Sequence, residues 1–172
     1  MLLHAPRSAR RATAPTPLTL PDLAALTRSV AAQVRTGAHE VVLDPERRWY
    51  RRLHADPFVD VWLISWVAEQ ATELHDHAGS IGALTVVSGV LDEQRWVGAE
   101  GGLRHRRLRA GRGAGFALGH VHDVVNTEPV HAVSVHAYSP PLTAMSYYAV
   151  EDGPAGAALR RTRSVLTDGG SA

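Results

Sequence analysis

Two histidines, His75 and His77, stand one residue apart at the start of an apolar run rich in β-branched residues, ELHDHAGSIGALTVVSG (residues 73–89). In a β-strand, residues i and i+2 point to the same side, so the two rings can converge on one point. Two neutral imidazoles suit a borderline divalent metal. No acidic residue lies between His77 and Gly89, although a metal site of this kind often includes one. Taken alone, the pair fits a metal site and an exposed polar strand end equally well.

A third histidine ligand is expected from the segment GHVHDVVNTEP (residues 119–129), which follows a glycine-rich turn. His122 opens an apolar strand there, so its side chain can face inward and complete the site. His120 lies two residues before His122, so its side chain would point to the same side. It lies at the end of the loop, and it is the alternative ligand. The other histidines are expected to be ordinary surface or packing residues: His4, His39, His54, His105 and His131.

A second polar group, Ser134, His136 and Tyr138, alternates along the run HAVSVHAYS (residues 131–139). These three side chains share one face of a strand. On an inner face they would form a hydrogen-bonded relay in which each residue orients the next. On an outer face they would be a row of polar residues in water, with the intervening valines in the core. The residues by themselves leave both interpretations open.

The elements that must position these side chains are mostly short strands. Strand-like runs separated by Gly, Pro, Asn or Asp cover residues 59–67, 82–97, 102–110, 121–126 and 131–139. One amphipathic helix is expected over PDLAALTRSVAAQVRTG (residues 21–37), capped by Asp22, and a second only in AGAALRRTRSVL (residues 155–166). Many short strands without βαβ alternation predict an antiparallel barrel or sandwich, an all-β fold with a short N-terminal helix.

Composition narrows the function classes. The 172 residues, 45% of them hydrophobic, predict one domain over residues 21–166, between a disordered tail (1–20) and a loose C-terminal tail (167–172). The net charge of +1 creates no general attraction to nucleic acid or anionic membranes, and RHRRLRAGR (104–112) is expected to be a solvated strand. The absence of cysteine excludes disulfides and thiolate ligands. We expect a cytoplasmic monomer with neither a nucleic-acid nor a membrane partner.

The first histidine segment resembles the first motif of the cupins, which are small double-stranded β-helix barrels. That motif reads G-x5-H-x-H-x3–4-E-x6-G, and His75, His77 and Gly89 fall in register with it. Glu69 stands where the motif has its first glycine, and Gly82 stands where it has its acidic ligand.

The second histidine segment is similar to the second cupin motif, G-x5-P-x-G-x2-H-x3-N. It matches at Gly111, Gly119, His122 and Asn126, with Ala117 in place of the usual proline. Two gapped motifs in the right order are far more specific than either alone. The resemblance implies the cupin double-stranded β-helix barrel.

Gly82 in place of a carboxylate leaves three neutral imidazoles as the expected ligand set. A divalent metal held in this way keeps one more positive charge than at a site with two histidines and one carboxylate. A substrate that binds as a thiolate would supply the missing negative charge. About three positions of an octahedral shell would stay open for a bidentate substrate and O2.

Among three-histidine cupins, the chain resembles the cysteine dioxygenases from about Tyr50 to Pro141. Their segment Ser-x-His-x-Tyr-Ser-Pro-Pro matches residues 134–141. The resemblance implies iron(II) as the cofactor and the conversion of a thiol to a sulfinate with both atoms of O2. It also implies that the relay residues face the metal and that the Ser139–Pro140 peptide bond is cis.

The resemblance also implies a cationic clamp for a substrate carboxylate. The family's Tyr-x-Arg segment matches Tyr50 and Arg52 in RWYRRLHADPFVDVWLISW (residues 48–66). The planar guanidinium of an arginine can bind a carboxylate with two parallel hydrogen bonds. The alternative is that RRWYRR is a solvated basic turn, and we expect this of Arg47, Arg48 and Arg51.

The expected function is therefore a non-heme iron(II) dioxygenase that converts L-cysteine and O2 to cysteine sulfinate. The expected ligands are His75, His77 and His122. Alternatives are a dioxygenase of another small thiol (3-mercaptopropionate, cysteamine or a larger aminothiol) and a non-catalytic metal-binding cupin that acts as a sensor. Mammalian cysteine dioxygenases carry a cysteine at the Gly82 position, cross-linked to the tyrosine that corresponds to Tyr138, and this cysteine-free chain cannot form that thioether.

Overall fold

The computed structural model describes residues 17–153 and 156–167. Its elements, in chain order, are α1 (Leu20–Arg35), β1 (Tyr50–Ala55), β2 (Asp60–Trp66), β3 (His75–Asp76), β4 (Ile81–Ser88), β5 (Val90–Trp96), β6 (Leu103–Arg109), β7 (Gly113–Phe116), β8 (His122–Val125), β9 (Ala132–Ser139), β10 (Ala144–Gly153) and β11 (Gly156–Leu166). The predicted tails lie mainly outside the described residues, in 1–16 and 168–172.

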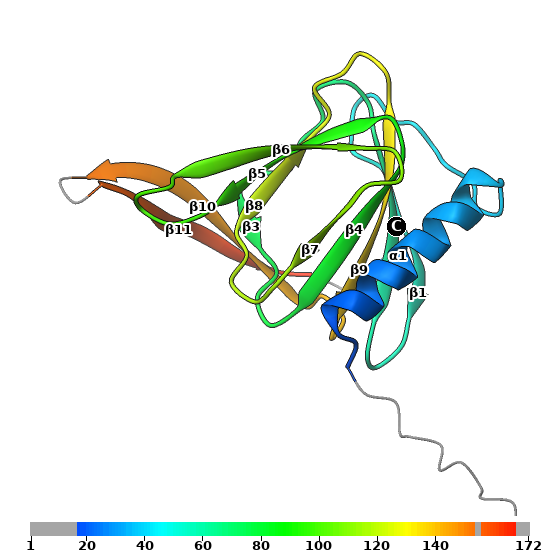
Figure 1. The fold of residues 1–172 in the computed structure, drawn as a ribbon, viewed down its shortest axis with the longest axis horizontal. Coiled ribbons are helices and arrows are strands. Elements are labelled where there is room, and N and C mark those ends of the chain that lie inside the picture. Colours follow the sequence, from blue (N-terminus) through cyan, green and yellow to red (C-terminus); the bar gives the residue numbers. More distant parts are fainter. Residues whose placement is uncertain (1–16, 154–155, 168–172) are drawn as a thin grey trace, which may run out of the picture.

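The strands form two antiparallel sheets. The five-stranded sheet has the order β1-β2-β9-β4-β7, and the six-stranded sheet has the order β11-β10-β3-β8-β5-β6. Figure 1 shows the two sheets facing each other, with α1 across the outer face of the five-stranded sheet and the β10–β11 hairpin extending to one side. This arrangement confirms the antiparallel fold with one N-terminal helix that the sequence predicts.

Helix α1 begins at Leu20, before the predicted cap, because Thr19 is the N-cap. The Thr19 hydroxyl accepts the backbone N–H of Asp22, and the Asp22 carboxylate accepts the backbone N–H of Thr19 at 3.0 Å, which forms a capping box. Asp22 is thus the third helical residue. Leu18, in the predicted tail, donates its backbone N–H to Ser139 Oγ at 2.9 Å.

Strand β9 lies in the middle of the five-stranded sheet, and all of its residues are buried. On its outer face, Val133, Val135 and Ala137 pack in the apolar cluster that includes Leu23 of α1. Its inner face belongs to a second apolar cluster between the sheets, which contains Trp66, Phe116 and Tyr138, among others. The alternation of a strand therefore directs Ser134 and His136 into the interior of the barrel.

The predicted second helix over residues 155–166 is wrong, because residues 156–166 form strand β11. It pairs antiparallel with β10 from Ala144↔Leu166 to Gly153↔Gly156. Ala, Leu and Arg are good helix formers, but intrinsic propensity is a weak bias, and backbone pairing with a neighbouring strand overrides it here.

The predicted strands all occur, but the run over residues 82–97 divides at Gly89 into β4 and β5. Gly89 has a φ of +72°, and a Cβ there would lie 2.6 Å from the carbonyl oxygen of His131. Glycine is therefore required at this motif position. At Glu69, where the motif has its other glycine, the backbone also adopts a positive φ of 66°.

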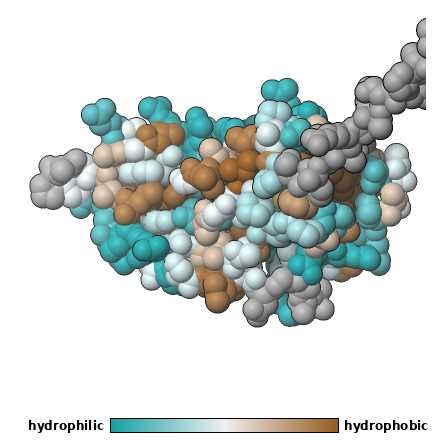
Figure 2. All heavy atoms as spheres, turned by 90° about the horizontal axis from the view of Figure 1, so that it is seen from below, coloured by the Kyte–Doolittle hydropathy of each residue, from teal (hydrophilic) through white to brown (hydrophobic). Residues whose placement is uncertain are grey.

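Apolar residues on the face in Figure 2 occur in several patches between hydrophilic ones. The most exposed large apolar side chains of the described residues are Leu166, Leu118 and Val130, at 79%, 64% and 61%. They come from separate segments of the chain. No helix in the described part of the chain is long and apolar enough to cross a membrane.

Candidate metal centre

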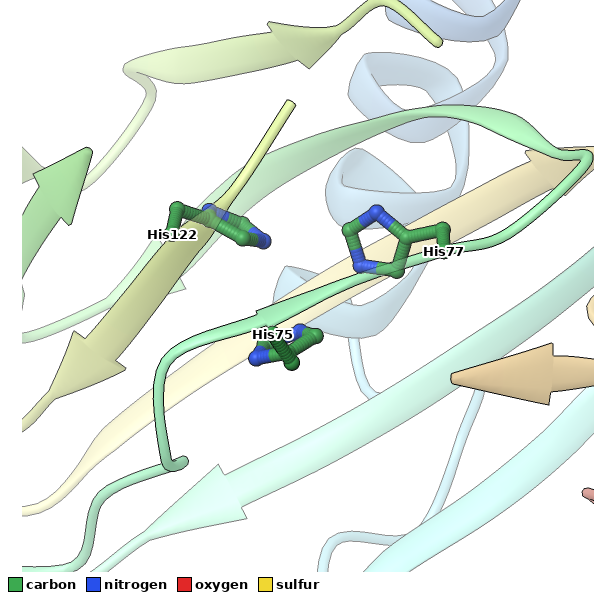
Figure 3. A group of neighbouring side chains, drawn as sticks. All are labelled: His75, His77 and His122. Atoms are coloured by element: carbon green, nitrogen blue, oxygen red, sulfur yellow. The ribbon is translucent and has the colours of Figure 1, made fainter. Parts of the chain in front are cut away.

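Three histidines converge inside the barrel. His75 lies on β3, His77 on the loop that follows it, and His122 opens β8, where it pairs with His75. One ring nitrogen of each residue lies within 4.8 Å of those of the other two, and all three side chains are buried. Figure 3 shows the three rings directed toward a common point. The structure thus brings together the three histidines that the sequence predicts as ligands.

The hydrogen bonds of His75 and His122 determine which nitrogen each ring presents. His75 Nδ1 lies 2.7 Å from the carbonyl oxygen of Glu73, and His122 Nδ1 lies 2.8 Å from Glu93 Oε1. Both acceptors lack a proton, so each Nδ1 carries one and each Nε2 keeps a free lone pair. Nε2 of His77 and Nε2 of His122 are buried without a hydrogen-bond partner among the described residues. Unpaired buried nitrogens are costly, and a divalent metal would satisfy them.

The three rings are neutral at pH 7. Burial lowers the pKa of His75 to about 3, and the neighbouring His122 contributes to this shift. Burial likewise places the pKa of His77 well below its usual value, and it lowers the pKa of His122 although the Glu93 carboxylate opposes this shift. Neutral imidazole is the form that binds a metal, so protons do not compete for these nitrogens at neutral pH.

Glu93 on β5 is a functional residue that the sequence analysis missed. Its side chain is fully buried, and its carboxylate accepts from His122 Nδ1, from His120 Nε2 at 3.3 Å and from the guanidinium of Arg106. Burial alone would raise the pKa of Glu93, but these three hydrogen bonds hold it far below its usual value. A carboxylate behind a ligating histidine fixes the ring's tautomer and orientation.

Glu93 bears on two sequence expectations. Arg106, expected on a solvated strand, pairs with Glu93 across β5 and β6. His120, the alternative ligand, lies outside the three-histidine group; its Nε2 is 3.3 Å from Glu93 Oε1, and His120, Glu93 and His122 form a second group whose donor atoms lie within 4.8 Å of one another. The alternation of side chains along a strand could have indicated this role. Glu93 lies two residues after the buried Leu91, so its side chain faces inward from β5 as that of Leu91 does.

Gly82 has a steric reason to lack a side chain. It pairs with Tyr138 across β4 and β9, and a Cβ at Gly82 would lie 2.7 Å from Tyr138 Cδ1 and 3.0 Å from Phe116 Cδ2. The rings of Tyr138 and Phe116 therefore occupy the space that an acidic ligand at this position would need.

Ser134, His136 and Tyr138 form a buried hydrogen-bonded chain. Ser134 Oγ lies 2.9 Å from His136 Nε2, and His136 Nδ1 lies 3.3 Å from the Tyr138 hydroxyl. The indole N–H of Trp66 donates to Ser134 Oγ at 2.9 Å. The inward-facing alternative for these residues is therefore the observed one. The Ser139–Pro140 peptide bond that follows is cis, as expected.

Proton positions along this chain follow from its first donor. The Trp66 N–H can only donate, which leaves the Ser134 hydroxyl to donate in turn to His136 Nε2. Burial lowers the pKa of His136 to about 3, so the ring is neutral and its proton lies on Nδ1, directed to the Tyr138 oxygen. Burial raises the pKa of Tyr138, so the phenol keeps its own proton. That O–H remains available to another acceptor.

A cavity of about 530 Å³ opens beside the histidines. His75, His122, His136 and Tyr138 line it, and apolar groups such as Leu142, Met145 and Leu166 line other parts of its wall. Two of the three neutral nitrogen donors, those of His75 and His122, thus share this cavity with a protonated phenol, and the third, His77, lies beside them.

The structure places the two residues of the predicted clamp differently. Tyr50 lines the cavity, whereas Arg52 is outside its lining and has its guanidinium 5.5 Å from the centre of the Trp62 ring. Arg48, expected to be solvated, is half-buried and lines the cavity. The expectation for Arg48 is therefore wrong, because the segment before β1 directs this side chain inward, against the Trp66 ring.

Residues 19–151 match a protein-family model described as cysteine dioxygenase type I. No curated protein matches the chain. Among solved structures, TT1209 from Thermus thermophilus has a TM-score of 0.52 and 19% identity, over 59% of this chain and 90% of that one.

A Klebsiella pneumoniae protein with a double-stranded β-helix domain has a TM-score of 0.51 and 22% identity, over 69% of this chain and 89% of its own. KdgF from Halomonas sp. has a TM-score of 0.50 and 16% identity, over 60% of this chain and 88% of its own. At these identities the similarity shows the fold, a cupin-like double-stranded β-helix.

Proposed function

Because this chain belongs to the cysteine dioxygenase type I family, we propose that it is a non-heme iron(II) dioxygenase that converts L-cysteine and O2 to cysteine sulfinate. The observation that supports this most is the group of three buried histidines whose ring nitrogens converge, two of which, His75 and His122, line one cavity together with Tyr138. The proposal includes action in the cytoplasm as a monomer.

The reaction needs no outside reductant. A thiol RSH and one O2 give RSO2H: the O–O bond breaks, two S–O bonds form, and the four electrons that O2 accepts come from the sulfur. The thiol proton leaves when the sulfur binds as a thiolate and is returned to the product. A cavity beside three ligands therefore contains all that the reaction requires once metal, thiol and O2 are present.

His75, His77 and His122 are the residues that would hold iron(II). Bound there, the metal would activate O2 and bind the thiolate, whose charge compensates for the missing carboxylate ligand. The protein's own contribution is orientation: Glu73 and Glu93 hold two of the rings through their Nδ1 atoms. Holding thiol and O2 side by side makes their encounter intramolecular.

Tyr138 is proposed to donate its hydroxyl proton to a hydrogen bond with substrate or O2. His136 and Ser134 would position that hydroxyl, since His136 Nδ1 contacts it and Ser134 fixes the tautomer of His136. Tyr50 and Arg52 remain the sequence-based proposal for the substrate carboxylate.

Another thiol remains the close alternative, because the apolar side of the cavity suits a substrate larger than cysteine. A non-catalytic metal-binding sensor would need the three histidines but has no use for a buried relay that ends at the cavity.

Substitution of a ligand tests the proposal. The iron-loaded protein should consume O2 with L-cysteine, and mass analysis should identify the sulfinate. His75→Ala should lose iron and at least about 100-fold of this rate, since one of three ligands is gone. His54→Ala, at an exposed histidine on β1, is the matched control and should match wild type. Sulfinate formation by His75→Ala at the wild-type rate, with iron supplied, would show the assignment to be wrong.

A further inference from the structure

The cavity beside the histidines is larger than the reacting groups need. Its volume is about 530 Å³. Protein cavities of about 300–1,000 Å³ hold drug-sized ligands, and a thiol of the size of L-cysteine together with O2 is far smaller than such a ligand. Space therefore remains in the cavity for a further part of the substrate.

This space has an apolar wall at the base of the β10–β11 hairpin. Leu142 precedes β10, Met145 lies on β10, and Leu166 ends β11. The wall begins beside a metal ligand, because Tyr147 of β10 pairs with His75 of β3 and the centres of the two rings lie 6.2 Å apart. The hairpin wall thus consists of Leu142, Met145, Tyr147 and Leu166, all of which line the cavity.

Contacts on both sides of His75 hold the hairpin in place. Arg163 of β11 donates from Nη1 and Nη2 to the two carboxylate oxygens of Glu73, at 2.8 and 2.6 Å. The hydroxyl of Tyr148 on β10 donates to Asp76 Oδ2 at 2.6 Å. Glu73 and Asp76 flank His75 in the sequence. The hairpin is therefore fixed to the segment that carries a ligand, and a wall that is already in place loses little entropy when it binds a substrate.

The hairpin wall includes apolar surface that is in contact with water. Leu166 is 79% exposed although it lines the cavity, and Leu142 and Met145 are half-buried. Removing apolar surface from water is favourable, and exposed apolar surface beside a pocket is typical of a ligand-binding groove. An apolar group bound against this wall would displace water from these side chains.

We propose that the hairpin wall binds an apolar substituent of the thiol substrate; this inference rests on the proposed function. One molecule can place its sulfur at the metal and an alkyl or aryl group against the wall, because His75 and His122 line the same cavity. The preferred substrates are then thiols with such a group, and L-cysteine reacts but leaves the wall uncovered. The substituent takes no part in the oxidation of the sulfur, so the reaction balances as it does for L-cysteine.

Anaerobic calorimetry on the iron-loaded protein tests the wall directly. The ligands are 3-mercaptopropionate and its α-methyl, α-propyl and α-benzyl derivatives, which share the reacting end and differ only in the apolar substituent. Affinity should rise about threefold to fourfold for each methylene that becomes buried. The heat capacity change of binding should become more negative along the series, as expected for burial of apolar surface.

Substitutions at two neighbouring residues of β11 separate the wall from general effects. Leu166→Gln should lower the affinity ratio between the α-benzyl and the unsubstituted thiol about 3- to 10-fold, because a polar side chain replaces part of the wall. Leu166→Met keeps an apolar side chain and should keep this ratio within about twofold. Val165→Gln, at a 44% exposed neighbour outside the cavity lining, is the matched control and should keep the wild-type ratio.

Turnover provides the second measurement, through O2 uptake and the mass of the sulfinate. KM should fall along the series while kcat stays nearly constant, because the wall binds the ground state and the transition state alike. A flat series, or the same affinity ratio in Leu166→Gln as in Val165→Gln, would overturn the inference. If affinity rises along the series but no thiol is oxidised, the proposed function fails and the hairpin wall stands as a binding site. If L-cysteine is oxidised and the substituents bring no gain, the inference fails and the proposed function stands.

Discussion

At the scale of single residues, the candidate site depends on groups that hold the ligands as much as on the ligands themselves. Glu93 is fully buried, and its carboxylate places a negative charge 2.8 Å from His122 Nδ1. It is not a member of the three-histidine group, yet its oxygen determines which nitrogen of His122 is free. The carboxylate that the first motif places at Gly82 is thus replaced by one behind a histidine, where it acts on orientation.

Glu93→Gln should weaken iron binding about 10- to 100-fold, the usual effect of losing the carboxylate behind a ligating histidine. The amide can present an N–H to His122 Nδ1, which disfavours the tautomer with a free Nε2. Iron affinity is measured by competition with a chelator. Glu128→Gln, at a surface carboxylate paired with Arg107, is the matched control and should bind iron as wild type does. Equal affinity of both variants would contradict the role of Glu93.

At the scale of elements, β9 connects the outer core to the site. Its alternating side chains contact the α1 layer on one face and form the Ser134–His136 hydrogen bond on the other. None of the expected ligands or relay residues lies on helix α1. It covers the outer face of the sheet and holds β4 and β9 in a buried environment, so the residues on their inner faces keep fixed positions.

Leu23→Ala tests this separation of roles. Leu23 is fully buried in the cluster between α1 and the sheet, so truncation should lower the free energy of unfolding by about 2–5 kcal/mol through lost burial and a cavity. Urea denaturation measures this change. Iron affinity of the folded variant should match wild type, because no ligand lies on the helix. Leu118→Ala, at a side chain that is 64% exposed, should change stability by less than about 0.5 kcal/mol.

At the scale of the whole molecule, closing two sheets over one another places four histidines in a buried interior. An imidazole removed from water resists protonation, so folding and proton binding oppose each other below the ordinary histidine pKa. The same burial that prepares the ligands for a metal therefore makes the metal-free protein sensitive to acid.

The metal-free protein should lose stability as pH falls below about 6.5. Burial lowers the pKa of His136 to about 3, so between pH 6.5 and 3 the unfolded chain binds a proton there that the folded chain does not. Stability then falls by about 1.4 kcal/mol per pH unit for each such group. Urea unfolding at pH 7, 6 and 5 measures the slope.

In His136→Gln this slope should be smaller by the amount that one proton contributes, about 1.4 kcal/mol per pH unit. An unchanged slope in His136→Gln would mean that His136 already titrates normally in the folded protein.

Which side chains share a face of a strand can be read from the sequence alone. The spacing of His75 and His77, the alternation of Ser134, His136 and Tyr138, and the gap at Gly82 are local facts, because a strand directs every second residue to one side. Together with the cupin motifs, they predicted the barrel and the three histidines that meet in it.

Which groups meet across long stretches of sequence depends instead on the three-dimensional fold. Glu93 reaches Arg106 because β5 and β6 pair in one particular register, Arg48 lines the cavity beside Trp66, and the segment before Leu166 is a strand because β10 lies beside it. Local spacing says nothing about these contacts. They depend on strand register and sheet closure, which are set by the packing of the whole core.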